Sequence, residues 1–397
     1  MAQQSKVYAV KVALKAEKWI KQSHPWVFDQ SIEKVNGSPK TGDVVVIFDQ
    51  RKNSFLACGF WDAESPIRIK LCQFGKPARL NDEWFGEKLH EAMELRVPLQ
   101  KKQTNSYRLL YGENDFFPGL ICDVYDNVAV LKVYSGIWWQ RIPLMAALIQ
   151  EVTNCKSVIL RTSRNASHSQ YKDGQILRGE LLDPEVIFTE FGLRFKAHVI
   201  KGHKTGYFLD HRSNRNRVGQ MSKGKDVLDI FSYAGGFSVH ALSGGAKMVT
   251  SVDISEQALQ LAKTNASLND YDGMHATLAG DAFEVMQDLI DQSKKFHLVI
   301  VDPPSFAKKA TEVPKAEKAY KRLVQLASKL VSNQGVLVMA SCSSRISPDQ
   351  FYNLVEAELE HAQCSFDLLS RWGHDIDHPV RFPEGEYLKC GFYQIQT

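Results

Sequence analysis

The sequence lacks the features that mark membrane-spanning and disulfide-stabilised proteins. No apolar run approaches the roughly 20 residues that cross a bilayer, and the first residues contain no signal-peptide core. The seven cysteines are odd in number and scattered, and none forms a Cys-x-x-Cys pair. We therefore expect a reducing, cytoplasmic location, with no membrane contact, no disulfide framework and no metal site.

The composition also lacks a strong charge imbalance, internal repeats and low-complexity segments. Hydrophobic residues make up 44% and charged residues 24% of the 397 positions, which is typical of a soluble globular protein. This length exceeds one ordinary core, so two or three domains are expected. The formal net charge of +4 is compatible with a nucleic-acid partner without establishing one.

The sequence predicts three consecutive domains, at 1–78, 79–190 and 191–397. The first contains short strand-like segments separated by polar turns, which suggests a small β-barrel. Its predicted strands are Val44–Phe48, Phe55–Gly59 and Ile67–Leu71. The second begins with a helix-favouring segment from Asn81 to about Lys102 and continues as a separate α/β unit.

From Lys225 the pattern becomes a strict alternation of strands and helices. This alternation predicts a parallel, doubly wound α/β sheet of the Rossmann-like type, with helices on both faces. The predicted strands are Val227–Phe231, Val249–Asp253, Ala276–Gly280, Leu298–Asp302 and Gly335–Ser341.

The turn after the first of these strands is a candidate cofactor-binding loop. It runs from Asp229 to Ser238 and contains Ser232 and the pair Gly235-Gly236. Ligands of open parallel sheets lie beyond the carboxyl ends of the strands, and glycine lets the backbone approach a ligand closely. We therefore assign Asp229, Ser232 and Gly235 to a cofactor, although a glycine pair alone could simply form a turn.

Acidic residues end the next two strands as well. Asp253 is positioned to accept both hydroxyls of a ribose, and Asp281 to meet an adenine amino group. Each acid alone could merely cap a helix, but three strand-terminal acids in consecutive βα units indicate a nucleoside cofactor. The spacing departs from the G-x-G-x-x-G fingerprint, which disfavours NAD.

The fourth and fifth strands end in Asp302-Pro-Pro-Ser-Phe306 and Ser341-Cys-Ser343. In a doubly wound sheet the fourth strand neighbours the first and the fifth neighbours the fourth, so Asp302 and Cys342 should face the cofactor crevice. A free cysteine is usually a small buried hydrophobe, which is the competing interpretation and the one we apply to the other six.

A thiol and a carboxyl group together suit methylation of a pyrimidine at C5. That carbon is a poor nucleophile toward a sulfonium methyl group, and thiolate addition at C6 makes it enamine-like. An acid at N3 of cytosine, the role predicted for Asp302, assists the addition. The base must leave its stack, and Phe306 is either a wall of its pocket or a plain core residue.

Several motifs together resemble the bacterial 23S ribosomal RNA cytosine-C5 methyltransferases (large-subunit methyltransferase I). They are Gly206–Arg212, Asp229–Ser238, Asp302–Phe306 and Ser341–Ser343, with His24–Phe28 similar to the family's RNA-binding PUA domain and Tyr111–Leu120 similar to its middle domain. The resemblance covers most of the chain.

The resemblance implies S-adenosyl-L-methionine as cofactor and large-subunit ribosomal RNA as partner. It implies Cys342 as nucleophile, the four strand-end acids at the cofactor and target base, and Gly206–Arg212 on the approach to the cofactor; it leaves a homodimer open. Ser305 stands where many RNA cytosine-C5 enzymes carry a second cysteine, so another base must take the C5 proton.

Basic residues flank the predicted site. We assign Lys201, Lys204, Arg212, Arg215 and Lys308 to RNA phosphates, which position a strand without reading its sequence. A solvated charged surface is the alternative. Two other functions also remain open: methylation of another base position, such as guanine N7 or an exocyclic amine, with an inert Cys342, and a catalytically inactive RNA-binding assembly factor.

Overall fold

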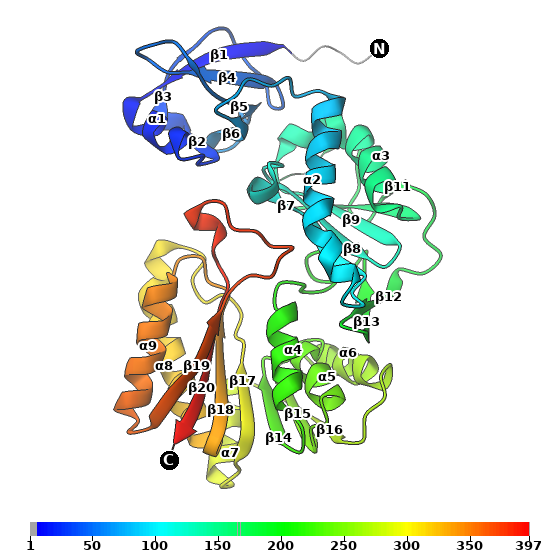
Figure 1. The fold of residues 1–397 in the computed structure, drawn as a ribbon, viewed down its shortest axis with the longest axis vertical. Helices are drawn as coiled ribbons and strands as arrows, with labels where there is room; N and C mark the ends of the chain where they lie inside the picture. The colour runs from blue at the N-terminus through cyan, green and yellow to red at the C-terminus, as the bar shows by residue number, and fades with distance from the viewer. Residues whose placement is uncertain (1–5, 165, 167, 397) are drawn as a thin grey trace. The chain divides into compact units, whose positions relative to one another are not determined.

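The computed structural model describes residues 6–164, 166 and 168–396, which form two compact units (Figure 1). Residues 1–5 and 397 of the predicted first and third domains lie outside the described residues. Unit 1 is built from Met1–Phe188, Ala197–Phe208 and Ile376–Gly385, and unit 2 from Thr189–Lys196, Leu209–Asp375 and Glu386–Thr397. The chain therefore passes between the units more often than three consecutive domains imply.

The first sheet of unit 1 contains six strands among the described residues, in the order β2-β6-β5-β4-β1-β3. Its β4, β5 and β6 match the three strands predicted in this part of the sequence, and β1 pairs parallel to β4. The elements of this region are β1 (Val7–Val12), α1 (Leu14–Lys21), β2 (Trp26–Phe28), β3 (Ile32–Val35), β4 (Val44–Phe48), β5 (Phe55–Trp61) and β6 (Ile67–Phe74).

A second sheet of unit 1 has the order β11-β10-β9-β8-β7 and shares a core with the first. The ring of Trp138 lies 5.5 Å from that of Phe60 in the first sheet and 5.9 Å from that of Phe85. The elements are α2 (Asp82–Gln100), β7 (Ser106–Tyr111), β8 (Leu120–Tyr125), β9 (Val128–Val133), α3 (Ile142–Thr153), β10 (Ser157–Thr162) and β11 (Ile176–Arg178). The hairpin β12 (Glu185–Glu190) and β13 (Leu193–His198) follows.

The segment Ile376–Gly385, which lies within the predicted third domain, packs with unit 1. The backbone N–H of Arg108 donates to Asp377 Oδ2 at 2.9 Å, and the Tyr111 hydroxyl donates to the Gly385 carbonyl at 3.0 Å. Both contacts join residues more than 260 positions apart in the chain. No local pattern in the sequence indicates such pairings.

Unit 2 confirms the predicted doubly wound α/β fold. Its described residues form a seven-stranded sheet in the order β16-β15-β14-β17-β18-β20-β19, parallel from β16 to β18 and antiparallel beyond. The strands are β14 (Asp226–Ile230), β15 (Met248–Asp253), β16 (Met274–Ala279), β17 (Phe296–Val301), β18 (Val331–Ser341), β19 (Ser365–Trp372) and β20 (Lys389–Gln396). All five predicted parallel strands are present, with small shifts at their ends.

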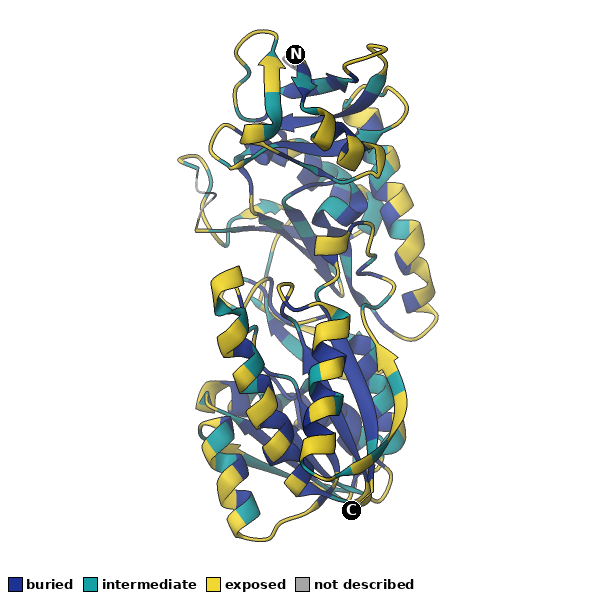
Figure 2. Ribbon diagram, turned by 90° about the vertical axis from the view of Figure 1, so that its left-hand side faces the viewer, coloured by how far each residue is buried: buried dark blue, intermediate teal, exposed yellow. Residues whose placement is uncertain are grey.

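Two layers of helices cover this sheet (Figure 1). The helices α4, α5 and α6 form one layer, and α7, α8 and α9 form the other. Their bounds are α4 (Arg212–Met221), α5 (Gly236–Ser243), α6 (Glu256–Ser267), α7 (Ala282–Asp291), α8 (Val313–Leu330) and α9 (Pro348–His361). The sheet interior is buried, whereas the outward helix faces are exposed (Figure 2). No helix in the described part of the chain is long and apolar enough to span a membrane.

Candidate active site at the carboxyl ends of the parallel strands

The loop after β14 has an unusual backbone. Phe231, Tyr233 and Gly235 all have positive φ, at 65°, 47° and 73°. Strained backbone of this kind costs free energy and tends to occur where a ligand is held. A Cβ at Gly235 would lie 2.8 Å from the Cβ of Ala262 on α6, so this glycine is required for helix packing in addition to any ligand contact.

Asp229 is a buried acid with one unsatisfied oxygen. Its Oδ2 accepts from the backbone N–H and the hydroxyl of Ser238, at 3.1 and 2.6 Å. Its Oδ1 and the Ser232 hydroxyl oxygen are buried without a hydrogen-bond partner among the described residues. Burial raises the pKa of Asp229 to about 7, because the charges of Asp302 and Asp253 add to desolvation and outweigh the Ser238 bonds.

Asp229 Oδ1 and Ser232 Oγ, which lack hydrogen-bond partners among the described residues, show whether a nucleoside cofactor would suit this loop. A buried polar atom without a partner is costly, and a ligand that supplies N–H or O–H groups removes this cost. S-adenosylmethionine carries both, on its amino acid end and its ribose. The residues of this loop therefore fit the cofactor that the sequence predicts.

Asp253 and Asp281 occupy different environments. Asp253 is half-buried at the end of β15, where its two oxygens accept from the backbone N–H groups of Tyr233 and Ser255, both at 2.9 Å. Asp281 is exposed and caps α7 by accepting from the N–H groups of Phe283 and Glu284. The capping role that the sequence offered as an alternative is thus observed for Asp281, and its predicted adenine contact stays a prediction.

Asp302 follows β17 and faces a buried histidine. His211 Nε2 lies 3.4 Å from Asp302 Oδ1, and the Asn214 amide N–H donates to His211 Nδ1 at 3.2 Å. Arg217 donates to the Asn214 oxygen, which orients the amide. His211 Nε2 forms no hydrogen bond within the described chain, so its contact with Asp302 is electrostatic. Burial lowers the pKa of His211, but the charges of Asp302 and Asp210 outweigh it and leave that pKa above its ordinary value.

Cys342 follows β18, the neighbour of β17 in the sheet. Its Sγ donates to the Pro303 carbonyl at 3.8 Å, so the thiol lies beside the residue that follows Asp302. Cys342 and Cys364 are half-buried, whereas the remaining cysteines are buried. Burial raises the pKa of the Cys342 thiol to about 12, with a contribution from the negative charge of Asp302.

Two of the predicted RNA contacts are corrected by the structure. Arg215 is 3% exposed and forms a two-point ion pair with Glu190, at 2.7 and 2.6 Å. Arg212 is fully buried, with Asp375 Oδ2 at 3.3 Å from its guanidinium. These cations neutralise interior carboxylates, and neither side chain presents a surface to a phosphate.

The other three predicted RNA contacts, Lys201, Lys204 and Lys308, are exposed. Lys204 adopts a left-handed backbone, with φ at 58°, and its carbonyl accepts from the Lys132 ammonium at 2.8 Å. Lys201 and Lys204 belong to unit 1, whereas Lys308 belongs to unit 2. Their assignment to RNA remains a prediction.

Sequence reasoning missed two residues that the structure brings to the Cys342 region. His211 lies in the quoted motif Gly206–Arg212, yet the sequence gave it no role. Lys389 begins β20, far along the chain from Cys342, and donates to the carbonyl of Ser343 at 2.6 Å. Only the antiparallel pairing of β20 with β18 shows that the two belong together.

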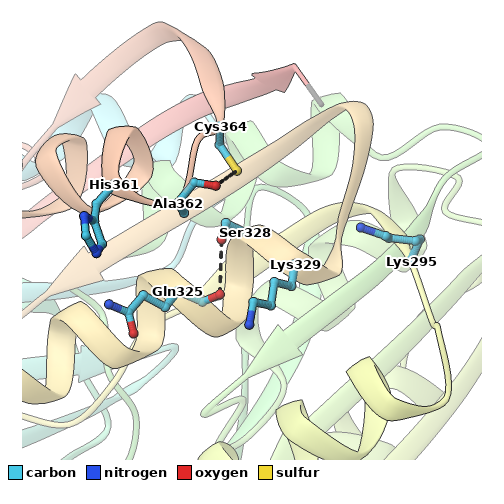
Figure 3. Close-up of a pocket in the computed structure, with 7 residues that line it drawn as sticks. All are labelled: Lys295, Gln325, Ser328, Lys329, His361, Ala362 and Cys364. Atoms are coloured by element: carbon cyan, nitrogen blue, oxygen red, sulfur yellow. Dashed lines mark hydrogen bonds between the residues drawn. The ribbon is translucent and has the colours of Figure 1, made fainter.

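A separate surface hollow lies at the opposite end of β17. It is lined by Lys295, Gln325, Ser328, Lys329, His361, Ala362 and Cys364 (Figure 3). Lys295 directly precedes β17, whereas Asp302 directly follows it. Because ligands of open α/β sheets lie at the carboxyl ends of the strands, this hollow is distinct from the candidate site.

This site has the strand order, the strained loop after β14 and the strand-end acids that suit a nucleoside cofactor. These features are typical of the Rossmann-like methyltransferases. Residues 152–386 match the S-adenosylmethionine-dependent methyltransferase family, and residues 10–74 match the PUA-like domain. A methyltransferase structure from Streptococcus mutans is 23% identical, with a TM-score of 0.83 over 97% of this chain and 99% of that one. Another methyltransferase with a TM-score of 0.82 was solved in complex with SAH.

Curated relatives are more similar in sequence. The ribosomal RNA large subunit methyltransferase of Deinococcus radiodurans is 38% identical over 97% of each chain. The ribosomal RNA large subunit methyltransferase I of Tolumonas auensis is 36% identical over 94% of this chain and 96% of its own. The chain belongs to the S-adenosylmethionine-dependent methyltransferase family that includes these proteins, and S-adenosylmethionine is its cofactor.

Proposed function

We propose that this chain methylates C5 of cytosine in large-subunit ribosomal RNA through a covalent adduct on Cys342. The observation that carries the proposal is the half-buried Cys342 thiol beside the Asp302-Pro303 loop, beyond the carboxyl ends of β17 and β18. The names of the curated relatives and the match to a PUA-like domain support ribosomal RNA as the substrate.

The cofactor would be held by the loop after β14 and by Asp253, and when bound it supplies an activated methyl group. Cys342, as the thiolate, adds to C6 of the cytosine, and the ring π electrons move to C5, which becomes nucleophilic. For this step Asp302 carries a proton, which its O–H donates to N3 in a hydrogen bond that stabilises the electron density the ring gains. The His211 imidazole lies 3.4 Å from Oδ1 of Asp302, so we assign Oδ2 to the base.

Release reverses the addition. After C5 carries the methyl group, its proton leaves, the C5–C6 double bond forms again, and the Cys342 Sγ–C6 bond breaks with its electron pair returning to sulfur. Ser305 occupies the position of a second thiol in related enzymes, and its hydroxyl shares a hydrogen bond of 3.0 Å with the Ser343 hydroxyl. Asp302 is 25% exposed, so we assign solvent water as the acceptor of the C5 proton.

The test is nucleoside mass spectrometry of large-subunit ribosomal RNA after incubation with the purified chain and S-adenosylmethionine. We expect 5-methylcytidine with the wild-type protein and none with Cys342→Ala. Cys364→Ala is the matched control, because Cys364 is the other half-buried cysteine of the described chain, and it should retain activity. Wild-type activity in Cys342→Ala would refute the covalent mechanism.

One observation favours a second candidate. The Cys342 thiol donates to the Pro303 carbonyl and burial raises its pKa, and both favour the neutral thiol over the thiolate that C5 chemistry needs. Methylation of another base position, such as guanine N7 or an exocyclic amine, requires no thiolate. A methylated purine in the same nucleoside analysis would support this alternative, whereas absence of both modification and cofactor binding would support an inactive RNA-binding factor.

A further inference from the structure

The loop that carries Cys342 is held by a buried ammonium group. Lys389 is 1% exposed, and its Nζ donates to the carbonyls of Ser343, Ile346 and Tyr387, at 2.6, 2.9 and 2.8 Å. Lys389 forms no ion pair within the described part of the chain, although the negative charge of Glu386 acts on it and raises its pKa. A buried, unpaired charge costs several kcal/mol, so three hydrogen bonds to carbonyls are the compensation that this site offers.

The three hydrogen bonds of Lys389 also show that it does not act as a base. An ammonium group has three N–H donors and no lone pair, and here each donor has a carbonyl acceptor. Lys389 is therefore not oriented to act as a base. Two of its acceptors belong to the turn after Cys342, whose ends are also joined by the Ile346 N–H donating to the Ser343 carbonyl at 3.3 Å.

The charged groups around Cys342 determine how readily its thiol ionises, so a nearby cation affects its pKa. Burial, Asp302 and Asp210 all raise the pKa of Cys342, whereas the positive charge of Lys389 lowers it. From α8, the Tyr320 hydroxyl donates to Ser341 and keeps its proton, because burial raises its pKa to about 12. Burial lowers the pKa of Lys389 to about 8, so the ammonium is charged at pH 7.

We propose that Lys389 is a positioning residue for the Cys342 nucleophile. Its three hydrogen bonds fix the turn that carries the thiol, and its charge stabilises the thiolate that remains after the thiol proton passes to solvent. The inference rests on the proposed role of Cys342 but concerns a property of the thiol that is measurable without RNA. It also accounts for a lysine without an ion pair in the described chain at the start of a largely buried strand.

The test is the pH dependence of Cys342 alkylation by iodoacetamide in the full-length chain, measured by peptide mass spectrometry. In Lys389→Met we expect alkylation at pH 7 to be about tenfold slower, with the difference shrinking above pH 8 as the wild-type Lys389 loses its charge. Lys389→Arg, which keeps the charge and the donors, should recover most of the wild-type rate. An unchanged profile in Lys389→Met would overturn the proposal.

Lys70→Met is the matched control for the loss of a buried lysine. Lys70 is 6% exposed and donates to Asp62 and to the Ile67 carbonyl in the first sheet of unit 1, so its loss should leave the Cys342 profile unchanged. Lys389→Gln, which removes the charge but keeps two donors, is measured in parallel and serves if the Met variant does not fold. A wild-type profile in the Gln variant would also contradict the proposal.

The outcomes separate the two claims. Methylation by Cys342→Ala would refute the covalent mechanism. The effect of Lys389 on Cys342 alkylation, measured in proteins that retain Cys342, would still stand. A Lys389→Met protein with normal alkylation and reduced 5-methylcytidine formation would retain the function and assign Lys389 a purely structural role.

Discussion

Replacing Asp229 by asparagine is expected to stabilise the cofactor-free protein at neutral and alkaline pH while weakening cofactor binding. The Asp229 side chain is 1% exposed, one of its oxygens has no partner in the described chain, and burial raises its pKa from 3.8 to about 7. The folded protein therefore binds this proton more tightly than the unfolded chain does. Stability from this group is fully present below pH 3.8 and is lost as the pH rises to 7.

The magnitude follows from the size of the shift. Each unit of pKa difference corresponds to about 1.4 kcal/mol, so about three units cost the wild-type protein about 4 kcal/mol above pH 7. Asparagine cannot ionise and escapes this cost. The free energy of unfolding of Asp229→Asn, relative to wild type, should therefore be about 3 kcal/mol larger at pH 8 than at pH 5.

The assay is urea denaturation of the cofactor-free protein at pH 5 and pH 8, combined with calorimetric titration of S-adenosylmethionine. Asp226→Asn is the matched control, because Asp226 begins the same strand and its side chain is 34% exposed. Its ion pair with the half-exposed His297 is a surface contact, so any pH-dependent gain should stay below about 1 kcal/mol. If the difference between Asp229→Asn and wild type is the same at both pH values, the reasoning about this buried acid is refuted.

Other predictions concern the ion pairs and the polar contacts. Glu190→Gln should lower the free energy of unfolding by about 3–5 kcal/mol, because Arg215 loses its buried partner; urea denaturation without such a loss would contradict the structural role assigned to this pair. Lys201→Gln combined with Lys204→Gln should weaken RNA binding and reduce the slope of log affinity against log salt by about 1.4, and an unchanged slope would remove them from the interface. Asp302→Asn should lower the methylation rate by about 10² or more in single-turnover assays, whereas a near-normal rate would exclude an acid at N3.

The sequence was most informative where structure depends on local pattern. Alternating strands and helices predicted the parallel sheet, and the order of a doubly wound sheet predicted that β17 lies between β14 and β18. Ser255 directly precedes α6 and caps it, because its side chain accepts from the Ala258 N–H, as expected of a serine at this position. These features depend on residues within one element or on a topology shared by many proteins.

The sequence was least informative where distant segments meet. Arg212 and Arg215 resemble surface cations in the sequence, because their partners lie about 25 positions before or 160 positions after them. Ile376–Gly385 belongs to unit 1, and its two prolines and one glycine do not show in the sequence where the segment packs. Lys389 has no motif of its own, and only strand pairing brings it to the Cys342 turn.

The most direct test of the account is to trap the thiol on its substrate. Ribosomal RNA that contains 5-fluorocytidine at the modified position cannot lose a C5 proton, so the adduct should persist after methylation. We predict a denaturation-resistant protein–RNA complex whose cross-linked peptide contains Cys342, and no complex with Cys342→Ala. Methylated RNA without any such complex, or a cross-link at another cysteine, would contradict the central claim.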